Sequence, residues 1–241
     1  MTELSEFILA ERELYLDNDN NLFAFSLSQA LRYYEFIMII SSRHKEVSLK
    51  MATNSRKLME SISPAQGTWT MTDEQIRLYE EGPHLATQVH LEIESFYLFA
   101  KTFLDKVALF LQNYFGQARG VSLVSHDKLT KSHEQYRISK GLIYPDGFSE
   151  SLQFLKEHVC DYRDKQISHL QNPRTVKATI FSVSGQTRIV ATPFFPNESQ
   201  IGIQIESKEL PELLFAIDKY LQLVITVIKS NRTKTKFKLK E

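Results

Sequence analysis

The stretch from Asp161 to His169 holds the residues of this chain best suited to chemistry on a phosphodiester. It reads Asp-Tyr-Arg-Asp-Lys-Gln-Ile-Ser-His and is dense in charged and polar groups. Arg163 could bind a phosphate through two parallel hydrogen bonds. His169 could give or take a proton near neutral pH. The residue types therefore point to phosphodiester binding or cleavage.

A helix with one apolar face is expected to carry this stretch. Its apolar residues recur at spacings of four and three, which predicts a helix over residues 148–170. They are Phe148, Leu152, Leu155, Val159 and Tyr162. Pro173 disfavours helical geometry at the residue before it, so the helix should end near Asn172. His169 would then lie near the helix end, where unpaired carbonyl groups and the helix dipole favour its protonated form.

The spacing of the two candidate residues leaves two interpretations open. Six positions at 100° each place Arg163 and His169 about 120° apart around a regular helix. They would share a face only if the helix loosens before His169 or if the arginine reaches around it. The alternative is a solvated charge cluster, in which His169 only caps the helix.

The arrangement Arg163-Asp164-x4-His169 resembles the Arg-x(4–6)-His motif of HEPN domains. In that motif the residue after the arginine is often Asn, His or Asp, and here it is Asp164. The helix expected around residues 91–101 is similar to the long second helix of several HEPN families. As a pattern of helices, the resemblance extends over roughly residues 20–230.

The resemblance implies a metal-independent endoribonuclease, of the kind found among toxins of toxin–antitoxin pairs and phage-defence effectors. Two subunits would bring their motifs together in one composite cleft. His169 would act on the 2′-hydroxyl or on the leaving 5′-oxygen, and Arg163 would bind the scissile phosphate. Asp164 would orient one of these two residues. Candidate supporting residues are Glu94, Lys165 and Ser168.

The partners implied are RNA, a second copy of the chain, and an antitoxin or regulatory protein, with no cofactor. The alternative function is a non-catalytic HEPN-like dimer that binds a nucleotide or a protein. A metal site is not expected: His90 and Glu94 are four positions apart and could face one ion, but no second such pair accompanies them.

The composition favours one helical domain. The chain has 241 residues, of which 42% are hydrophobic, with only 8 glycines and 7 prolines. Basic and acidic residues balance at 29 each, so an RNA site would have to be a local patch. The single Cys160 is expected to be structural. It allows no intramolecular disulfide, which fits a reducing compartment.

We expect a cytoplasmic protein without a membrane partner. The first residues, Met1 to Glu6, lack the basic-then-apolar pattern of a signal peptide. The longest apolar runs, such as Phe36 to Ile40, are too short to span a bilayer.

The predicted fold is mainly α: a HEPN-like helical bundle over residues 1–230, with a β-hairpin or three-strand insertion at about 174–206, before the last helix. Helices are expected over 3–16, 22–43, 47–62, 72–115 with an interruption at Gly82-Pro83, 126–140, 148–170 and 211–229. Residues 17–21 should form a turn, and Trp69 should pack onto the bundle from a loop. Glu92 and Glu94 are expected to be solvated unless Glu94 orients the motif arginine.

The basic tail of residues 231–241 is expected to be flexible and solvated. Its basic residues alternate along the chain: Arg232, Lys234, Lys236, Lys238 and Lys240. Such a tail could add non-specific affinity for RNA that weakens with salt.

Overall fold

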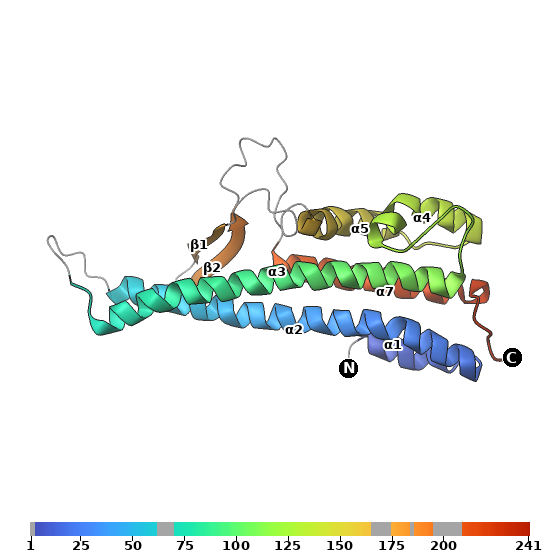
Figure 1. The fold of residues 1–241 in the computed structure, drawn as a ribbon, viewed down its shortest axis with the longest axis horizontal. Coiled ribbons are helices and arrows are strands. Elements are labelled where there is room, and N and C mark those ends of the chain that lie inside the picture. Colours follow the sequence, from blue (N-terminus) through green and yellow to red (C-terminus); the bar gives the residue numbers. More distant parts are fainter. Residues whose placement is uncertain (1–2, 62–69, 165–174, 184–185, 195–208) are drawn as a thin grey trace.

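Two long helices form the frame of the protein. The computed structural model describes residues 3–61, 70–164, 175–183, 186–194 and 209–241. Helix α2 (Asp17–Ser61) has 45 residues and α3 (Asp73–Phe115) has 43, and they run antiparallel side by side (Figure 1). The mainly α prediction is therefore confirmed. None of the helices in the described ranges is both long and apolar enough to span a lipid bilayer.

The remaining helices gather around one half of the α2–α3 pair (Figure 1). Helix α1 (Glu3–Arg12) packs on α2, and α7 (Leu210–Ser230) also contacts α2. Helices α4 (His126–Lys140) and α5 (Phe148–Leu155) form a further layer over α3 and α7. The other half of the α2–α3 pair extends beyond them as a two-helix arm.

Helix α2 is continuous where the sequence predicts a turn followed by two helices. Asp17 and Asp19 lie in its first turn. Aspartate and asparagine are common in turns, but negative charge is also favourable at a helix N-terminus, where it meets the positive end of the dipole. No glycine or proline interrupts the chain from residue 17 to 61. The expectation of a break near residues 44–46 is therefore wrong.

Helix α3 also continues through the predicted interruption at Gly82-Pro83. It starts as predicted, with a capping box in which the Gln75 N–H donates to Thr72 Oγ1 and the Thr72 N–H donates to Gln75 Oε1. A proline inside a helix costs about 3 kcal/mol. Leu78 and Leu85 are buried on either side of Pro83, and this packing offsets the cost.

Two strands follow the motif region. Strand β1 (Thr175–Val183) pairs antiparallel with β2 (Gln186–Phe194), with Ile180 opposite Ile189. Strand β2 contacts α2. The third strand predicted at residues 200–206 and the loop with Trp69 lie outside the described residues.

The basic tail is docked onto the bundle, which corrects the expectation of a solvated end. Phe237 is buried, with its ring 5.7 Å from that of Tyr15 and 5.4 Å from that of Tyr114. The Lys236 N–H donates to the Tyr114 carbonyl, and the Lys240 N–H donates to the Leu14 carbonyl, both at 2.9 Å. The alternation noted in the sequence turns one apolar side chain inward and leaves the lysines on either side exposed.

Candidate functional site

The helix that carries the motif widens just before Arg163. Regular helix α5 gives way to a π-helix, η1 (Lys156–Asp161), and Arg163 and Asp164 have the same π-helical geometry. Lys156 Nζ lies 3.0 Å from Asp161 Oδ2, although five positions separate these residues. On a regular α-helix these two side chains would lie about 140° apart around the axis. In a π-helix, where hydrogen bonds join residues five positions apart, they lie on the same side. The helix thus begins to widen before Arg163. A widened helix is the condition under which Arg163 and His169 could share one face.

The Arg163 guanidinium is only partly engaged. Its Nη1 donates to Asp164 Oδ1 at 2.8 Å, and the side chain is 29% exposed. Its Nε is buried and has no hydrogen-bond acceptor among the residues that the structure describes. Leaving a buried donor unpaired costs about 1–3 kcal/mol, and more where the group is charged. An anionic oxygen bound there would remove this cost.

A tyrosine pair fastens the π-helical segment to α3. The rings of Tyr162 and Tyr97 stack at 4.4 Å between centroids and 21° between planes, and both side chains are buried. Burial raises the pKa of Tyr97 well above its usual value. The Tyr97 hydroxyl is therefore unsuited to proton transfer near neutral pH, and we assign the pair a positioning role.

Helix α3 also presents an ion pair to this segment. Lys101 Nζ lies 3.1 Å from Asp105 Oδ2. Burial lowers the pKa of Lys101, but the charge and hydrogen bond of Asp105, together with the charge of Asp164, outweigh it, so the net shift is upward. Lys101 thus stays charged within electrostatic range of Asp164. This pair was not predicted from the sequence, although Lys and Asp four positions apart on a helix are a recognisable signal.

The surroundings of Cys160 favour the predicted structural role over that of a nucleophile. It is buried, and burial raises the pKa of its thiol to about 12. A thiol with so high a pKa carries almost no thiolate at neutral pH, and thiolate is the reactive form.

His126 ties the helices behind the motif together. Its backbone N–H donates to Asp105 Oδ1 at 2.8 Å, and its Nε2 lies 3.1 Å from the Leu152 carbonyl oxygen. The ring is fully buried against Tyr220, and burial lowers its pKa to about 4. His126 therefore sits neutral between α3, α5 and α7, a role that local sequence did not indicate.

The other predicted residues divide into two groups. Lys165, Ser168 and His169 lie outside the described residues. Glu94, the residue expected to orient the motif arginine, is exposed on α3, three positions before Tyr97. The ion pair that the described residues show for Arg163 is with the next residue, Asp164.

The expectation of a solvated Glu92 is wrong. Its side chain is only 4% exposed and lies 2.5 Å from Arg43 Nη2. This ion pair joins α3 to α2, because Glu92 falls on the face that α3 turns towards its long partner.

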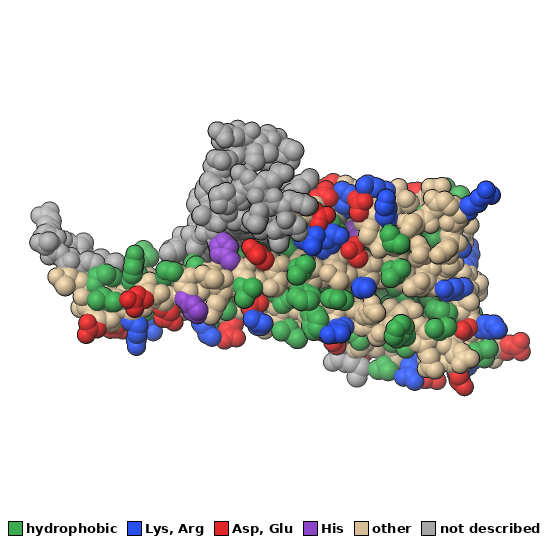
Figure 2. Space-filling model, in the orientation of Figure 1, with side chains coloured by type: hydrophobic (Ala, Val, Ile, Leu, Met, Phe, Trp, Pro, Cys, Tyr) green, Lys and Arg blue, Asp and Glu red, His purple; other side chains and the backbone are tan. Residues whose placement is uncertain are grey.

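The charge pattern around the motif is mixed. On the face drawn in Figure 2, basic and acidic side chains of the described residues are interspersed. Near the motif, Lys101, Lys156 and Arg163 are each paired with an aspartate. Any phosphate would have to compete with these carboxylates.

Within the described ranges, no group of three or more His, Cys, Asp or Glu side chains could hold a metal ion. Comparison of the chain with protein-family models, curated proteins and solved structures finds no match.

Proposed function

We propose that this protein is a metal-independent endoribonuclease of the HEPN type, acting as a toxin or phage-defence effector. The observation that supports this most is the state of Arg163, whose Nη1 is held by Asp164 while its buried Nε has no acceptor in the described part of the chain. A phosphate oxygen is the type of acceptor that such a guanidinium binds best.

In the proposed reaction, Asp164 fixes the orientation of the arginine. Asp164 occupies Nη1, and in the proposed complex the scissile phosphate approaches the opposite edge, formed by Nε and Nη2, with a small shift of the side chain that exposes the buried Nε. His169 takes the proton of the 2′-hydroxyl as that oxygen attacks phosphorus, or protonates the departing 5′-oxygen. Arg163 stabilises the negative charge that develops on the phosphate oxygens. The products are a 2′,3′-cyclic phosphate and a 5′-hydroxyl.

The proposed active unit is a homodimer. Two copies would bring their motifs together, so that Arg163 of one chain could act with His169 of the other. This removes the need for the two side chains to share a face of one helix. In this proposal Tyr97 and Tyr162 position the motif, and Lys101 adds positive charge beside it.

The alternative is a non-catalytic HEPN-like dimer that binds a nucleotide or a protein. The pairing of Arg163 with its neighbour Asp164 favours this function, because an arginine held in this way could serve only to stabilise the helix.

The two functions are separated by one assay. Purified protein is incubated with labelled RNA in EDTA, and the 3′ ends of any fragments are identified. The same assay is run on His169→Ala and on the matched control His84→Ala, which removes an exposed histidine of α3. The nuclease predicts cyclic-phosphate ends from the parent and His84→Ala, and none from His169→Ala.

Two results would contradict the nuclease. Equal cleavage by His169→Ala would point to another site or a contaminant. Absence of cleavage by a folded parent dimer, over a panel of structured and single-stranded RNAs, would favour the binding function.

A further inference from the structure

A serine and a histidine from neighbouring helices meet at the start of α5, away from the motif. Ser149 Oγ lies 3.0 Å from His133 Nε2. His133 belongs to α4, and Ser149 is the second residue of α5. The tight turn through Gly147, with φ of 80°, brings the start of α5 back against α4. This pair combines an oxygen nucleophile with a candidate base.

The second ring nitrogen of His133 fixes the tautomer. Nδ1 lies 2.8 Å from the carbonyl oxygen of Thr130. A carbonyl oxygen only accepts hydrogen bonds, so Nδ1 carries the proton. In the neutral ring Nε2 is then unprotonated and accepts the Ser149 O–H. This is the tautomer that a general base needs in order to activate a serine.

The His133 ring is also held in place by packing. It lies nearly parallel to the Tyr144 ring, with centroids 6.4 Å apart and 19° between the planes. Its side chain is 17% exposed, so most of it is withdrawn from solvent. Tyr144 in turn packs on Phe148 at 4.5 Å. The base is therefore supported by carbonyl and aromatic contacts, as an orienting third group supports the base in a catalytic triad.

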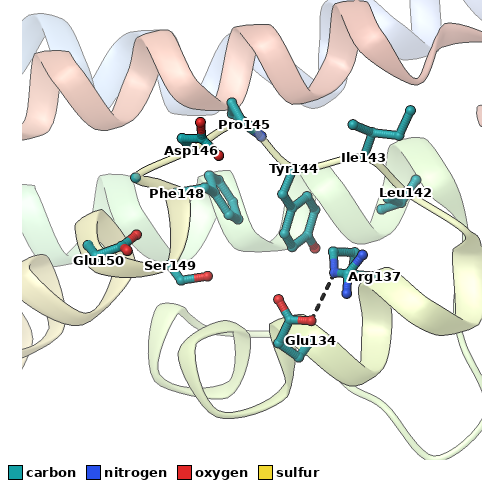
Figure 3. Close-up of a pocket in the computed structure, with 11 residues that line it drawn as sticks. Glu134, Arg137, Leu142, Ile143, Tyr144, Pro145, Asp146, Phe148, Ser149 and Glu150 are labelled. Atoms are coloured by element: carbon teal, nitrogen blue, oxygen red, sulfur yellow. Dashed lines mark hydrogen bonds and ion pairs between the residues drawn. The ribbon is translucent and has the colours of Figure 1, made fainter.

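Ser149 lines a cavity of about 360 Å³ (Figure 3). The apolar part of the lining comes from Leu142, Ile143, Tyr144 and Phe148. Figure 3 shows Ser149 extending from the start of α5 on the side of the cavity occupied by Glu134. The volume suits a small substrate, since ligand sites span about 300–1,000 Å³.

The start of α5 supplies hydrogen-bond donors beside the serine. The Phe148 N–H donates to the Pro145 carbonyl, and the Ser151 N–H donates to the Gly147 carbonyl. The N–H groups of Ser149 and Glu150, between them, have no acceptor inside the helix. They lie beside the hydroxyl and at the positive end of the dipole, where an oxyanion is stabilised.

The charges around the cavity narrow the substrate class. The lining includes the carboxylates of Glu134, Asp146 and Glu150 and one cation, Arg137. Arg137 Nε donates to Glu134 Oε2 at 2.8 Å, so its charge is already balanced. An anionic acyl group would be repelled, which leaves neutral or cationic acyl groups.

We propose that Ser149 and His133 form a second catalytic site that hydrolyses small neutral or cationic carboxylic esters. Ser149 Oγ forms a bond to the carbonyl carbon as its proton passes to His133 Nε2. The bond from that carbon to the alcohol oxygen then breaks, and the alcohol leaves with the proton. Water repeats the sequence on the acyl-serine, releasing the carboxylic acid and restoring Ser149.

The test uses a fluorophosphonate probe, which is attacked by activated serines with formation of an O–P bond and loss of fluoride. The parent, Ser149→Ala, His133→Gln and the control Ser151→Ala are labelled in parallel, and the labelled peptide is identified by mass spectrometry. Ser151 lies on the same helix, two positions further on. Hydrolysis of p-nitrophenyl acetate is measured on the same four proteins.

The proposal predicts that the probe labels Ser149 in the parent and in Ser151→Ala, and that Ser149→Ala is not labelled. Labelling of His133→Gln should be about 100-fold slower or more. Ester hydrolysis should follow the same order. The proposal is overturned if the folded parent is not labelled, or if Ser149→Ala is labelled as fast as the parent. It is also overturned if Ser149→Ala lowers only the melting temperature, because the hydrogen bond then merely joins α4 to α5.

Discussion

Tyr162 stacks on Tyr97 one residue before Arg163, and this contact anchors the motif segment to the long helix α3. Its ring planes differ by only 21°, so the two side chains share a wide apolar contact. The position of the arginine therefore depends on α3 as well as on its own helix.

Replacing Tyr97 tests this anchor. Tyr97→Ala should lower the free energy of unfolding by about 3–5 kcal/mol, as removal of a buried aromatic ring does. Tyr97→Phe keeps the ring and should cost much less. Urea denaturation of the two variants measures the difference. Equal losses would show that the hydroxyl group, rather than the stacked ring, stabilises the contact.

The proposed nuclease requires the two parallel hydrogen-bond donors of the Arg163 guanidinium and not only its positive charge. Arg163→Lys keeps one positive charge but cannot donate along two parallel directions. We expect RNA cleavage to fall about 100-fold, as when an aligned donor to a developing oxyanion is removed. Thermal melting should show a folded protein. Cleavage at the parent rate by Arg163→Lys would contradict the proposed role of Nε and Nη2.

The buried Glu92 should make α2–α3 packing sensitive to Arg43. Removing Arg43 leaves a carboxylate that is only 4% exposed without its cation. Arg43→Ala should therefore lower the free energy of unfolding by roughly 1–3 kcal/mol. The double variant Arg43→Met with Glu92→Met should be more stable than Arg43→Ala, since it also removes the buried carboxylate that Arg43→Ala leaves unpaired. Denaturant titration of both proteins tests this ordering.

His126 should make stability depend on pH. Its folded pKa of about 4 lies below the ordinary value of 6.5, so the unfolded chain binds more protons between these values. Stability is fully present above about pH 6.5, and falls as the pH is lowered towards 4. The loss is roughly 3 kcal/mol at most. In His126→Phe this part of the pH dependence should vanish, which unfolding curves at several pH values will show. An unchanged pH profile would assign the effect to other groups.

The docked tail should contribute to stability. Phe237→Ala removes a buried ring that contacts Tyr15 and Tyr114, and should cost about 3–5 kcal/mol. The neighbouring Lys238 is exposed, so Lys238→Ala should change stability by less than about 0.5 kcal/mol. Similar melting temperatures for the two variants would show that the tail is dispensable.

Local pattern was enough to predict several elements. The capping box at Thr72 sets the start of α3, and the 3.6-residue period with Pro211 in the first turn matches α7. These features depend on neighbours within one or two helical turns. The apolar residues Leu152 and Val159 were likewise placed correctly on the buried face of the motif helix.

Features set by distant residues could not be predicted in this way. Asp17 and Asp19 suit either a turn or a helix start, and packing on the bundle decides between them. Glu92 and Glu94 look alike in sequence, yet only Glu92 faces Arg43 on α2. The burial of His126 depends on Asp105 and Leu152, which come from two other parts of the chain. Residues 148–163 contain no proline or glycine that would predict the π-helix before Arg163.

The two-helix arm has a consequence for the dynamics of the protein. Over one half of the pair, other helices cover α2 and α3, whereas beyond these helices the contacts of α2 and α3 among the described residues are mainly with each other, apart from that of β2 with α2. Backbone amides near Ser61 and Asp73, where the two helices meet the tip, should therefore exchange with deuterium much faster than those near Phe23 and Tyr114. The arm should open from its tip in small steps, while the other half exchanges only through global unfolding.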